Sequence, residues 1–237
     1  MKLRLYRGIS VSKELAENII KNIKEKGLTG DEGKMKFKIP CIINIRKRLD
    51  EIFDSDPLAM NKFFGDFNRL GICTCGDKEG ALFYALKHNH SSQKTIPIII
   101  ELEVSLSDIY IDARDFLCPV FQFYDHKVPS KYIEQKQILK KIFGDKVLHY
   151  FDKCINTKNQ DIRIKMCNLA SFDEKIVLEH YQNKNVVRGR YGTTFCSAFF
   201  VQAPIPSNSI INCEKLSCTS PTTNMTIGNY IDINQII

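Results

Sequence analysis

Two short segments, far apart in the chain, carry residue types that suit the binding of an anion. In residues 5–10, Arg7 interrupts an apolar strand pattern and is followed by Gly8. In residues 72–85, Thr74 lies where a strand pattern changes to a helical one. A guanidinium group offers a planar fork of donors that matches a phosphate or carboxylate, and a glycine or a helix N-terminus lets backbone N–H groups approach an anion closely. Together the two segments predict a site for a phosphate-bearing ligand.

Each candidate residue also has an ordinary structural interpretation. Arg7 could form a surface salt bridge, and Thr74 could cap the helix that follows it. Tyr84, on that helix, could pack as a core aromatic residue. Burial and hydrogen bonding in the folded protein decide between these interpretations and a binding site.

The order and spacing of the two segments resemble the ADP-ribosyltransferase superfamily. In that family a first-strand Arg and a later Ser-Thr-Ser motif, followed by a helix with an Ala and an aromatic-Ala pair, hold NAD. Here Arg7 matches the family's Arg, and residues 73–75 match the triplet with cysteine at both serine positions. The resemblance covers roughly the first 110 residues, with a weaker echo near residues 195–211. It implies NAD as co-substrate and assigns five residues to the NAD site: Arg7, Gly8, Thr74, Gly76 and Tyr84.

The implied reaction transfers ADP-ribose from NAD to a macromolecule. Breaking the nicotinamide–ribose bond develops positive charge on the ribose, which a nearby carboxylate can offset. The resemblance implies that Arg7 fixes the diphosphate and that Thr74 hydrogen-bonds the ribose or positions its strand. It also implies that Tyr84 stacks on nicotinamide.

The carboxylate that the family uses is missing from its usual place. The late strand expected at residues 195–204, which ends in a Pro-containing turn, holds no Glu or Asp, and Gln202 is its only amide. Glu103, in a Glu-x-Glu pattern on an earlier strand, and Glu179, on an expected helix, are the candidates for the catalytic carboxylate. We favour a carboxylate from an unusual position. A Gln-dependent variant and a noncatalytic NAD- or nucleotide-binding interaction protein are the two alternatives.

A cluster of charges follows the strand expected from residue 109. Asp112, Arg114 and Asp115 lie within four residues of one another. Such a cluster forms either a structural ion-pair group or part of a functional cleft.

The chain has nine cysteines, an odd number with irregular spacing, which favours reduced thiols over a disulfide framework. Cys73 and Cys75 are too close for an ordinary structural zinc pair and no Cys-x-x-Cys occurs, so we expect no metal. A third hypothesis is a Cys-dependent hydrolase. It would use Cys73 or Cys196 as nucleophile and His180 or His126 as base.

The charge of the chain bears on the acceptor of the transfer. A formal net charge of +7 permits contact with the phosphates of a nucleic acid or a dinucleotide. The basic loop that holds Arg188 and Arg190 would bind phosphates, and Tyr191 beside it could stack a base. We therefore expect a macromolecular acceptor, with nucleic acid such as RNA slightly favoured over protein.

A small, basic transferase of this composition resembles toxin components of bacterial defence systems and secreted effectors. The resemblance implies that an antitoxin or inhibitor protein is a further partner. No apolar run approaches the roughly 20 residues of a membrane helix, and the N-terminus lacks the continuous apolar stretch of a secretory signal. We expect a cytoplasmic protein with no membrane partner.

The elements that would position these residues predict an α+β fold. The resemblance implies one domain over residues 1–237 with an ADP-ribosyltransferase-like split, curved β core, surrounding helices and a helical insertion at about 112–193. Strands are expected at residues 2–9, 71–75, 96–104, 109–116, 194–202, 207–213 and 225–233. Helices are expected at residues 12–26, with Ser12 as N-cap and Gly27 as stop, and at 42–53, 78–88, 131–143, 146–156 and 173–181. Phe63, Phe64 and Phe67 are expected to pack inward.

Overall fold

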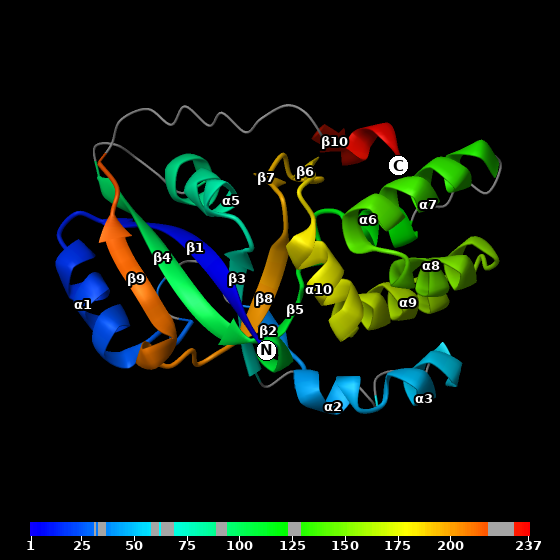
Figure 1. Ribbon diagram of the computed structural model, residues 1–237, viewed down its shortest axis with the longest axis horizontal. Coiled ribbons are helices and arrows are strands. Elements are labelled where there is room, and N and C mark those ends of the chain that lie inside the picture. The colour runs from blue at the N-terminus through cyan, green and yellow to red at the C-terminus, as the bar shows by residue number, and fades with distance from the viewer. Residues whose placement is uncertain are drawn as a thin grey trace.

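The computed structural model describes residues 1–30, 32, 37–57, 62, 69–88, 94–122, 129–217 and 230–237. Within them the chain forms an antiparallel sheet, a smaller sheet and surrounding helices (Figure 1). This arrangement confirms the predicted α+β class. Residues 225–229 of the strand predicted at 225–233, and the phenylalanines Phe63, Phe64 and Phe67, lie outside the described residues.

The main sheet has the strand order β5-β8-β3-β1-β4-β9, with β2 paired to β3. Its strands are β1 (Lys2–Ser12), β2 (Phe37–Ile39), β3 (Arg69–Cys75), β4 (Thr95–Ser105), β5 (Ile109–Ile111), β8 (Ala198–Gln202) and β9 (Ile210–Lys215). Strands β1 and β4 pair along their whole length, from Lys2↔Ser105 to Ser12↔Thr95. In contrast, the described register between β1 and β3 consists of the pair Tyr6↔Cys75. The sheet therefore splits between β1 and β3 into two halves.

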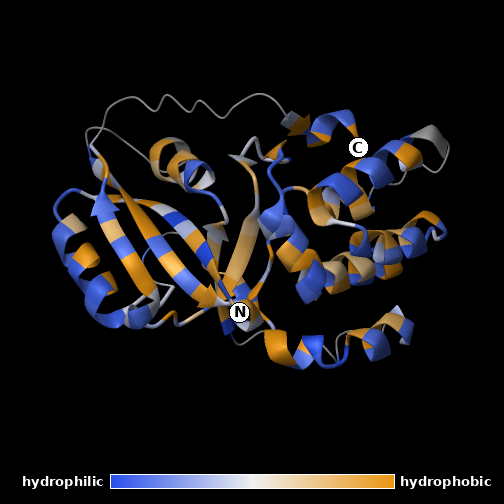
Figure 2. Ribbon diagram, in the orientation of Figure 1, coloured by the Kyte–Doolittle hydropathy of each residue, from blue (hydrophilic) through white to orange (hydrophobic). Residues whose placement is uncertain are grey.

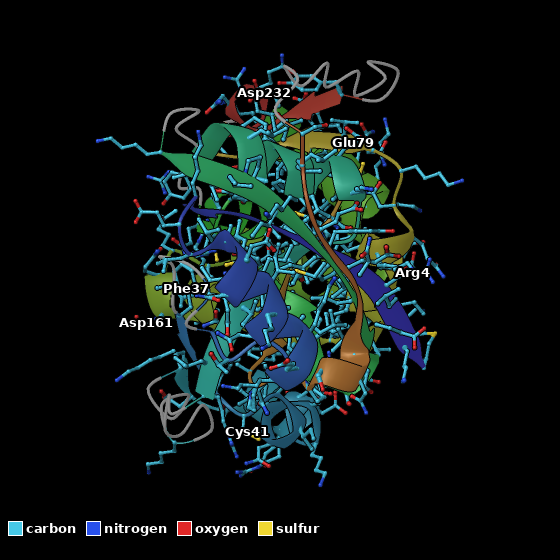
Figure 3. The ribbon with its side chains drawn as sticks, turned by 90° about the vertical axis from the view of Figure 1, so that its left-hand side faces the viewer. Arg4, Phe37, Cys41, Glu79, Asp161 and Asp232 are labelled. Atoms are coloured by element: carbon cyan, nitrogen blue, oxygen red, sulfur yellow. The ribbon has the colours of Figure 1, made fainter. Side chains whose placement is uncertain are left out.

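Strand β1 alternates between two environments. Its odd-numbered residues are buried, and this series includes Leu5, Arg7 and Ile9. Helix α1 (Ala16–Lys26) packs on that face through Ile23, and it lies in front of the sheet in Figure 3. Burial of apolar side chains between α1 and the strands stabilises this half of the sheet.

The ends of α1 differ in how well the sequence predicts them. The helix begins at Ala16, not after Ser12, because Ser12 is still paired in β1 and Leu15 occupies the cap position without a side-chain bond. The predicted stop at Gly27 is confirmed. Gly27 has φ 82°, and a Cβ there would lie 1.9 Å from the carbonyl oxygen of Ile205. Only glycine combines that backbone conformation with so close an approach.

The opposite face of β1 is covered by α5 (Lys78–Phe83), which continues as a π-helical turn over Tyr84–His88. Asp77 caps α5 by accepting a 2.6 Å hydrogen bond from the N–H of Gly80. Gly8 faces this helix, and a Cβ there would lie 1.8 Å from the carbonyl oxygen of Ala81. The missing side chain at Gly8 therefore lets α5 approach β1 closely.

A group of helices lies on the side of the main sheet away from α1 (Figure 1). Its members are α6 (Leu117–Gln122), α7 (Pro129–Phe143), α8 (Lys146–Ile155), α9 (Gln160–Phe172) and α10 (Glu174–Gln182). Many of their apolar residues belong to the buried core, among them Leu139, Phe151 and Leu169, and Figure 2 shows hydrophobic and hydrophilic residues interspersed along these helices. This group falls within residues 112–193, where the helical insertion was predicted.

Helix α9 was not predicted. Asn159 caps it by accepting bonds from the N–H groups of Asp161 and Ile162. The cations Arg163 and Lys165 are buried on it, where both donate to backbone carbonyl oxygens. Charged residues on a buried face conceal the apolar periodicity that identifies a helix.

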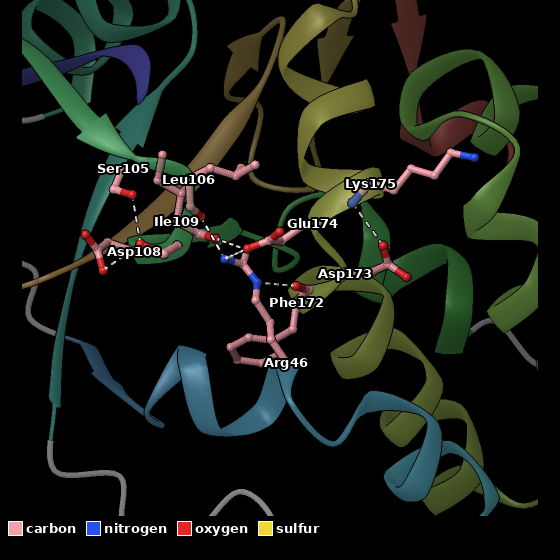
Figure 4. A network of polar contacts seen from close by, with 10 residues as sticks. Arg46, Ser105, Leu106, Asp108, Ile109, Phe172, Asp173, Glu174 and Lys175 are labelled. Carbon is pink, nitrogen blue, oxygen red and sulfur yellow. Dashed lines mark hydrogen bonds and ion pairs between the residues drawn. The ribbon is translucent and has the colours of Figure 1, made fainter. Parts of the chain in front are cut away.

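Two short helices, α2 (Ile42–Arg46) and α3 (Leu49–Asp54), replace the single helix predicted at residues 42–53. Arg46 ends the first and joins several elements (Figure 4). Its guanidinium donates to the carbonyl oxygens of Phe172 at 2.8 Å, Leu106 at 2.7 Å and Ile109 at 2.5 Å. It also forms a 3.0 Å ion pair with Glu174. Arg46 thereby connects α2 with the 3-10 turn Leu106–Asp108, β5 and the α9–α10 junction.

The smaller sheet holds the C-terminal strand of the chain. Strand β6 (Val186–Arg188) pairs with β7 (Thr194–Phe195) and, in parallel, with β10 (Tyr230–Asp232). The strand predicted at residues 194–202 is thus divided, with β7 in the small sheet and β8 in the main one. Among the described residues, no helix combines the length and apolar character needed to span a membrane.

Candidate functional site

A cavity of about 440 Å³ lies where the main sheet splits between β1 and β3. Residues 6–10 of β1 and 73–75 of β3 form two of its walls. The remaining walls come from Phe37, Tyr84, the turn after β5, residues 191 and 193, and the first residue of β8. Its volume is within the range of small-molecule and cofactor sites.

Arg7 is buried in the cavity wall. It is 7 % exposed, and its Nη1 donates a 2.8 Å hydrogen bond to the carbonyl oxygen of Cys73 across the split. Its Nε is buried without a hydrogen-bond partner in the described structure. Burial lowers the pKa of Arg7, but an arginine remains protonated at neutral pH. The surface salt bridge considered for Arg7 is therefore wrong, and a buried cation faces the cavity.

Thr74 and Tyr84 also line the cavity. Thr74 lies inside β3, where its Oγ1 donates to the carbonyl oxygen of Phe199 at 3.4 Å. The helix cap considered for Thr74 is wrong, because Asp77 caps α5. Burial raises the pKa of Tyr84, so its phenol is neutral and presents an aromatic ring with a polar end.

The charge cluster after β5 forms both an ion pair and a cavity wall. Arg114 binds Asp112 with both arms of its guanidinium, from Nε to Oδ1 at 2.7 Å and from Nη2 to Oδ2 at 2.5 Å. The same guanidinium stacks on the rings of Phe37 and Phe200, 3.8 and 4.8 Å from their centroids. The ion-pair interpretation is therefore confirmed for Asp112 and Arg114, and all three residues of the cluster line the cavity.

Asp115, the third member of the cluster, differs from Asp112. It is 9 % exposed, and its Oδ1 is buried without a hydrogen-bond partner among the described residues. Burial and the neighbouring Asp112 raise the pKa of Asp115, although hydrogen bonds from Thr193 and the Tyr191 N–H favour its anion. A buried carboxylate oxygen in a cavity wall is a strong candidate for contact with a ligand.

The two glutamates proposed as catalytic carboxylates lie away from the cavity. Glu103 is on β4, where its side chain is 47 % exposed and pairs with Lys2 at 3.4 Å. Glu179 is on α10 beside Gly144. Neither of them lines the cavity, whose described carboxylates are those of Asp112 and Asp115.

The two glycines assigned to the NAD site have structural roles. Gly8 lines the cavity, and its lack of a side chain is also required by α5. Gly76 is not among the lining residues. Its N–H donates to the carbonyl oxygen of Ser197 at 3.0 Å, and a Cβ there would lie 2.1 Å from the Ser197 hydroxyl. Gly76 therefore serves the packing of the β3–α5 turn against the turn before β8.

The residues expected to bind an acceptor are exposed and belong to the segment that includes the cavity-lining Tyr191. Tyr191 lines it and is 65 % exposed. Arg190 is exposed, with its guanidinium 5.8 Å from the centroid of the Tyr191 ring. Arg188 is also exposed and lies 3.8 Å from Asp232 of β10. An exposed aromatic ring of the cavity wall thus has the exposed cation of Arg190 beside it.

The structure contradicts the hydrolase pairing of His180 with a cysteine. Burial raises the pKa of Cys73 and of Cys196 to about 12, so both are thiols at neutral pH. His180 donates from Nδ1 to the carbonyl oxygen of Ile142 at 3.3 Å and accepts the Ala198 N–H at Nε2 at 3.2 Å. Burial lowers the pKa of His180 to about 3. Because both ring nitrogens are engaged, His180 is not placed to activate either thiol, and His126 lies outside the described residues.

Among the described residues, no group of three or more His, Cys, Asp or Glu side chains is arranged to hold a metal ion. Comparison of the chain with protein-family models, with curated proteins and with solved structures gives no significant match.

Proposed function

We propose that the protein is an NAD-dependent ADP-ribosyltransferase that moves ADP-ribose from NAD to a macromolecule. The observation that carries this proposal is the cavity at the split of the sheet, which gathers Arg7, Gly8, Thr74 and Tyr84. The sequence resemblance assigns these four residues to one NAD site. The split between β1 and β3 also agrees with the split β core that the resemblance implies.

The residues present suit a dinucleotide. The buried guanidinium of Arg7 matches a diphosphate, and the rings of Tyr6 and Tyr84 offer apolar surfaces to a nicotinamide or adenine. The unpartnered Nε of Arg7 and Oδ1 of Asp115 supply a donor and an acceptor. A ligand with both anionic oxygens and sugar hydroxyls would satisfy both atoms.

The proposed reaction breaks the bond between the nicotinamide nitrogen and C1′ of the ribose, and the electron pair leaves with nicotinamide. A nucleophilic atom of the acceptor bonds to C1′ and releases its proton to solvent. Arg7 would hold the diphosphate in place, and a carboxylate in the cavity would offset positive charge on the ribose. The walls would limit access of water, a competing nucleophile.

The rim suggests how an acceptor would approach. Arg188 and Arg190 would neutralise phosphates, and the exposed ring of Tyr191 would stack an unpaired base. These features favour nucleic acid, such as RNA, over protein. The wider proposal is a toxin- or effector-like transferase that acts in the cytoplasm and is held in check by an inhibitor protein.

A second function is a noncatalytic protein that binds NAD or a related nucleotide. It is favoured by the position of Glu103 and Glu179, which both lie away from the cavity. Such a protein would bind NAD in the same place without releasing nicotinamide.

The test is incubation of the purified protein with labelled NAD and, separately, total RNA, DNA and protein. We expect label in one macromolecular pool. The Arg7→Ala variant should lose transfer and bind NAD at least about tenfold more weakly, because it removes the buried cation. Arg4→Ala is the matched control, since Arg4 lies on the same strand but is exposed and pairs with Glu101.

The outcomes separate the two functions. Tight binding without transfer or nicotinamide release would favour the noncatalytic protein. Absence of NAD binding, or an Arg7→Ala variant that is folded and binds as well as the wild type, would contradict the site.

A further inference from the structure

Asp115 is a buried carboxylate whose side chain is hydrogen-bonded but whose Oδ1 has no hydrogen-bond partner among the described residues. It lies in the turn between β5 and α6 and contributes to the wall of the cavity. Its Oδ1 has no hydrogen-bond partner in the described part of the chain. Buried polar atoms in folded proteins are nearly always paired, so an orphaned acceptor in a cavity wall calls for a ligand.

The loop at residues 189–193 fixes the position of this carboxylate. The backbone carbonyl of Asp115 accepts a 2.7 Å bond from the N–H of Arg190. Thr193 and the N–H of Tyr191 hydrogen-bond its side chain, and the buried Oδ1 keeps no partner among the described residues. Gly189 allows the close contact, because a Cβ there would lie 2.7 Å from Cβ of Asp115. Asp115 is therefore held rigidly, as a group that orients a substrate must be.

The neighbouring charges leave Asp115 available to a ligand. Arg114 is engaged by Asp112 in a two-armed ion pair and stacks on Phe37. Asp112 therefore has a cationic partner of its own, whereas no described ion pair includes Asp115. Of the two described carboxylates that line the cavity, Asp115 is the one with an oxygen that has no hydrogen-bond partner.

We propose that Asp115 is the carboxylate of the transferase site: its Oδ1 accepts a hydrogen bond from a ribose hydroxyl and stabilises positive charge at C1′ as the nicotinamide bond breaks. This inference rests on the proposed function and replaces Glu103 and Glu179 in that role. It also explains why the late strand at residues 195–204 manages without a Glu or Asp.

The test compares Asp115→Asn with wild type in NAD binding by calorimetry and in nicotinamide release from NAD in the presence of the total RNA, DNA and protein that supply an acceptor. We expect release to fall by about 100-fold or more, because the anion is removed while the shape is kept, and NAD affinity to change by less than about tenfold. The control is Asp145→Asn, an exposed carboxylate on the helical group that pairs with Lys140 and should leave release unchanged.

A folded Asp115→Asn variant that releases nicotinamide at the wild-type rate would overturn the inference and leave the proposed function standing. A wild-type protein that releases no nicotinamide would overturn both.

If the variant does not fold, the pH profile of wild-type release gives the answer. The groups that face Asp115 are Asp112, Arg114, Thr193 and the backbone of Tyr191. Burial and the nearby charge of Asp112 raise the pKa of Asp115. Release should decline as the pH falls towards and below this raised pKa, and a rate that stays constant down to pH about 4 would refute the role.

Discussion

At the scale of single residues, the cavity combines groups whose charge states are set by burial. Arg7 is a buried cation, and Tyr84 is a neutral phenol. Cys73 and Cys75 occupy positions that are serine in the resembled motif, and burial raises the pKa of both thiols. Both thiols are therefore protonated at neutral pH and pack as small neutral side chains on either side of Thr74.

This assignment predicts how the thiols respond to alkylation. At pH 7.5 the pKa of about 12 leaves almost no thiolate at Cys73 or Cys196, so iodoacetamide should modify them far more slowly than in the unfolded chain. Mass spectrometry of peptides after timed alkylation measures the difference, with protein in denaturant as the control. Rapid labelling of Cys73 in the folded protein, or loss of activity in Cys73→Ser, would revive a cysteine nucleophile.

At the scale of elements, the cavity depends on how closely α5 approaches β1. Gly8 permits this approach, and Asp77 fixes the start of α5. Asp77 also accepts the N–H of Cys196 at 2.9 Å, which links the same turn to the segment before β8. These contacts thereby fix the positions of β1, β3 and β8, which form walls of the cavity, relative to one another.

The Gly8→Ala variant should be destabilised by about 2–3 kcal/mol, because the new Cβ would overlap the carbonyl oxygen of Ala81, a backbone atom. Gly192→Ala is the comparison. Its φ of 75° disfavours a side chain by about 1–2 kcal/mol, but nothing lies within 4 Å of the added Cβ. Urea unfolding measures the free energy of unfolding of both variants. A smaller decrease for Gly8→Ala than for Gly192→Ala would contradict the packing argument.

At the scale of the whole molecule, Arg46 joins the sheet to the helical group (Figure 4). Its replacement by alanine would leave the carbonyl oxygens of Phe172, Leu106 and Ile109 without this donor. We expect a loss of about 3 kcal/mol in the free energy of unfolding. Arg48→Ala is the matched control, since Arg48 pairs with Glu51 on the surface, where solvent screens the ion pair, and its loss should change the free energy of unfolding much less than the loss of Arg46. If urea unfolding gave the same decrease in the free energy of unfolding for both substitutions, the Arg46 junction would contribute little to stability.

The sequence predicts the local elements of this molecule better than it predicts their contacts. The strand around Arg7 and the stop at Gly27 follow from alternation and turn chemistry, which act over a few residues. Residue type and pattern along the chain pointed to Glu103 and Glu179 as the catalytic carboxylate. These two criteria do not indicate which side of the fold a carboxylate faces. Asp115 reaches the cavity through bonds to residues 189–193, and only the tertiary fold brings that loop to it.

The split of the sheet has a mechanical consequence. Because the described register between β1 and β3 is a single pair, widening the seam would break few backbone hydrogen bonds. The hydrogen bond from Arg7 to the carbonyl oxygen of Cys73 crosses this seam and connects its two sides. An anion that attracts the Arg7 guanidinium would therefore exert a force on both halves of the sheet. One side chain then determines both how easily the seam widens and how strongly the ligand is bound.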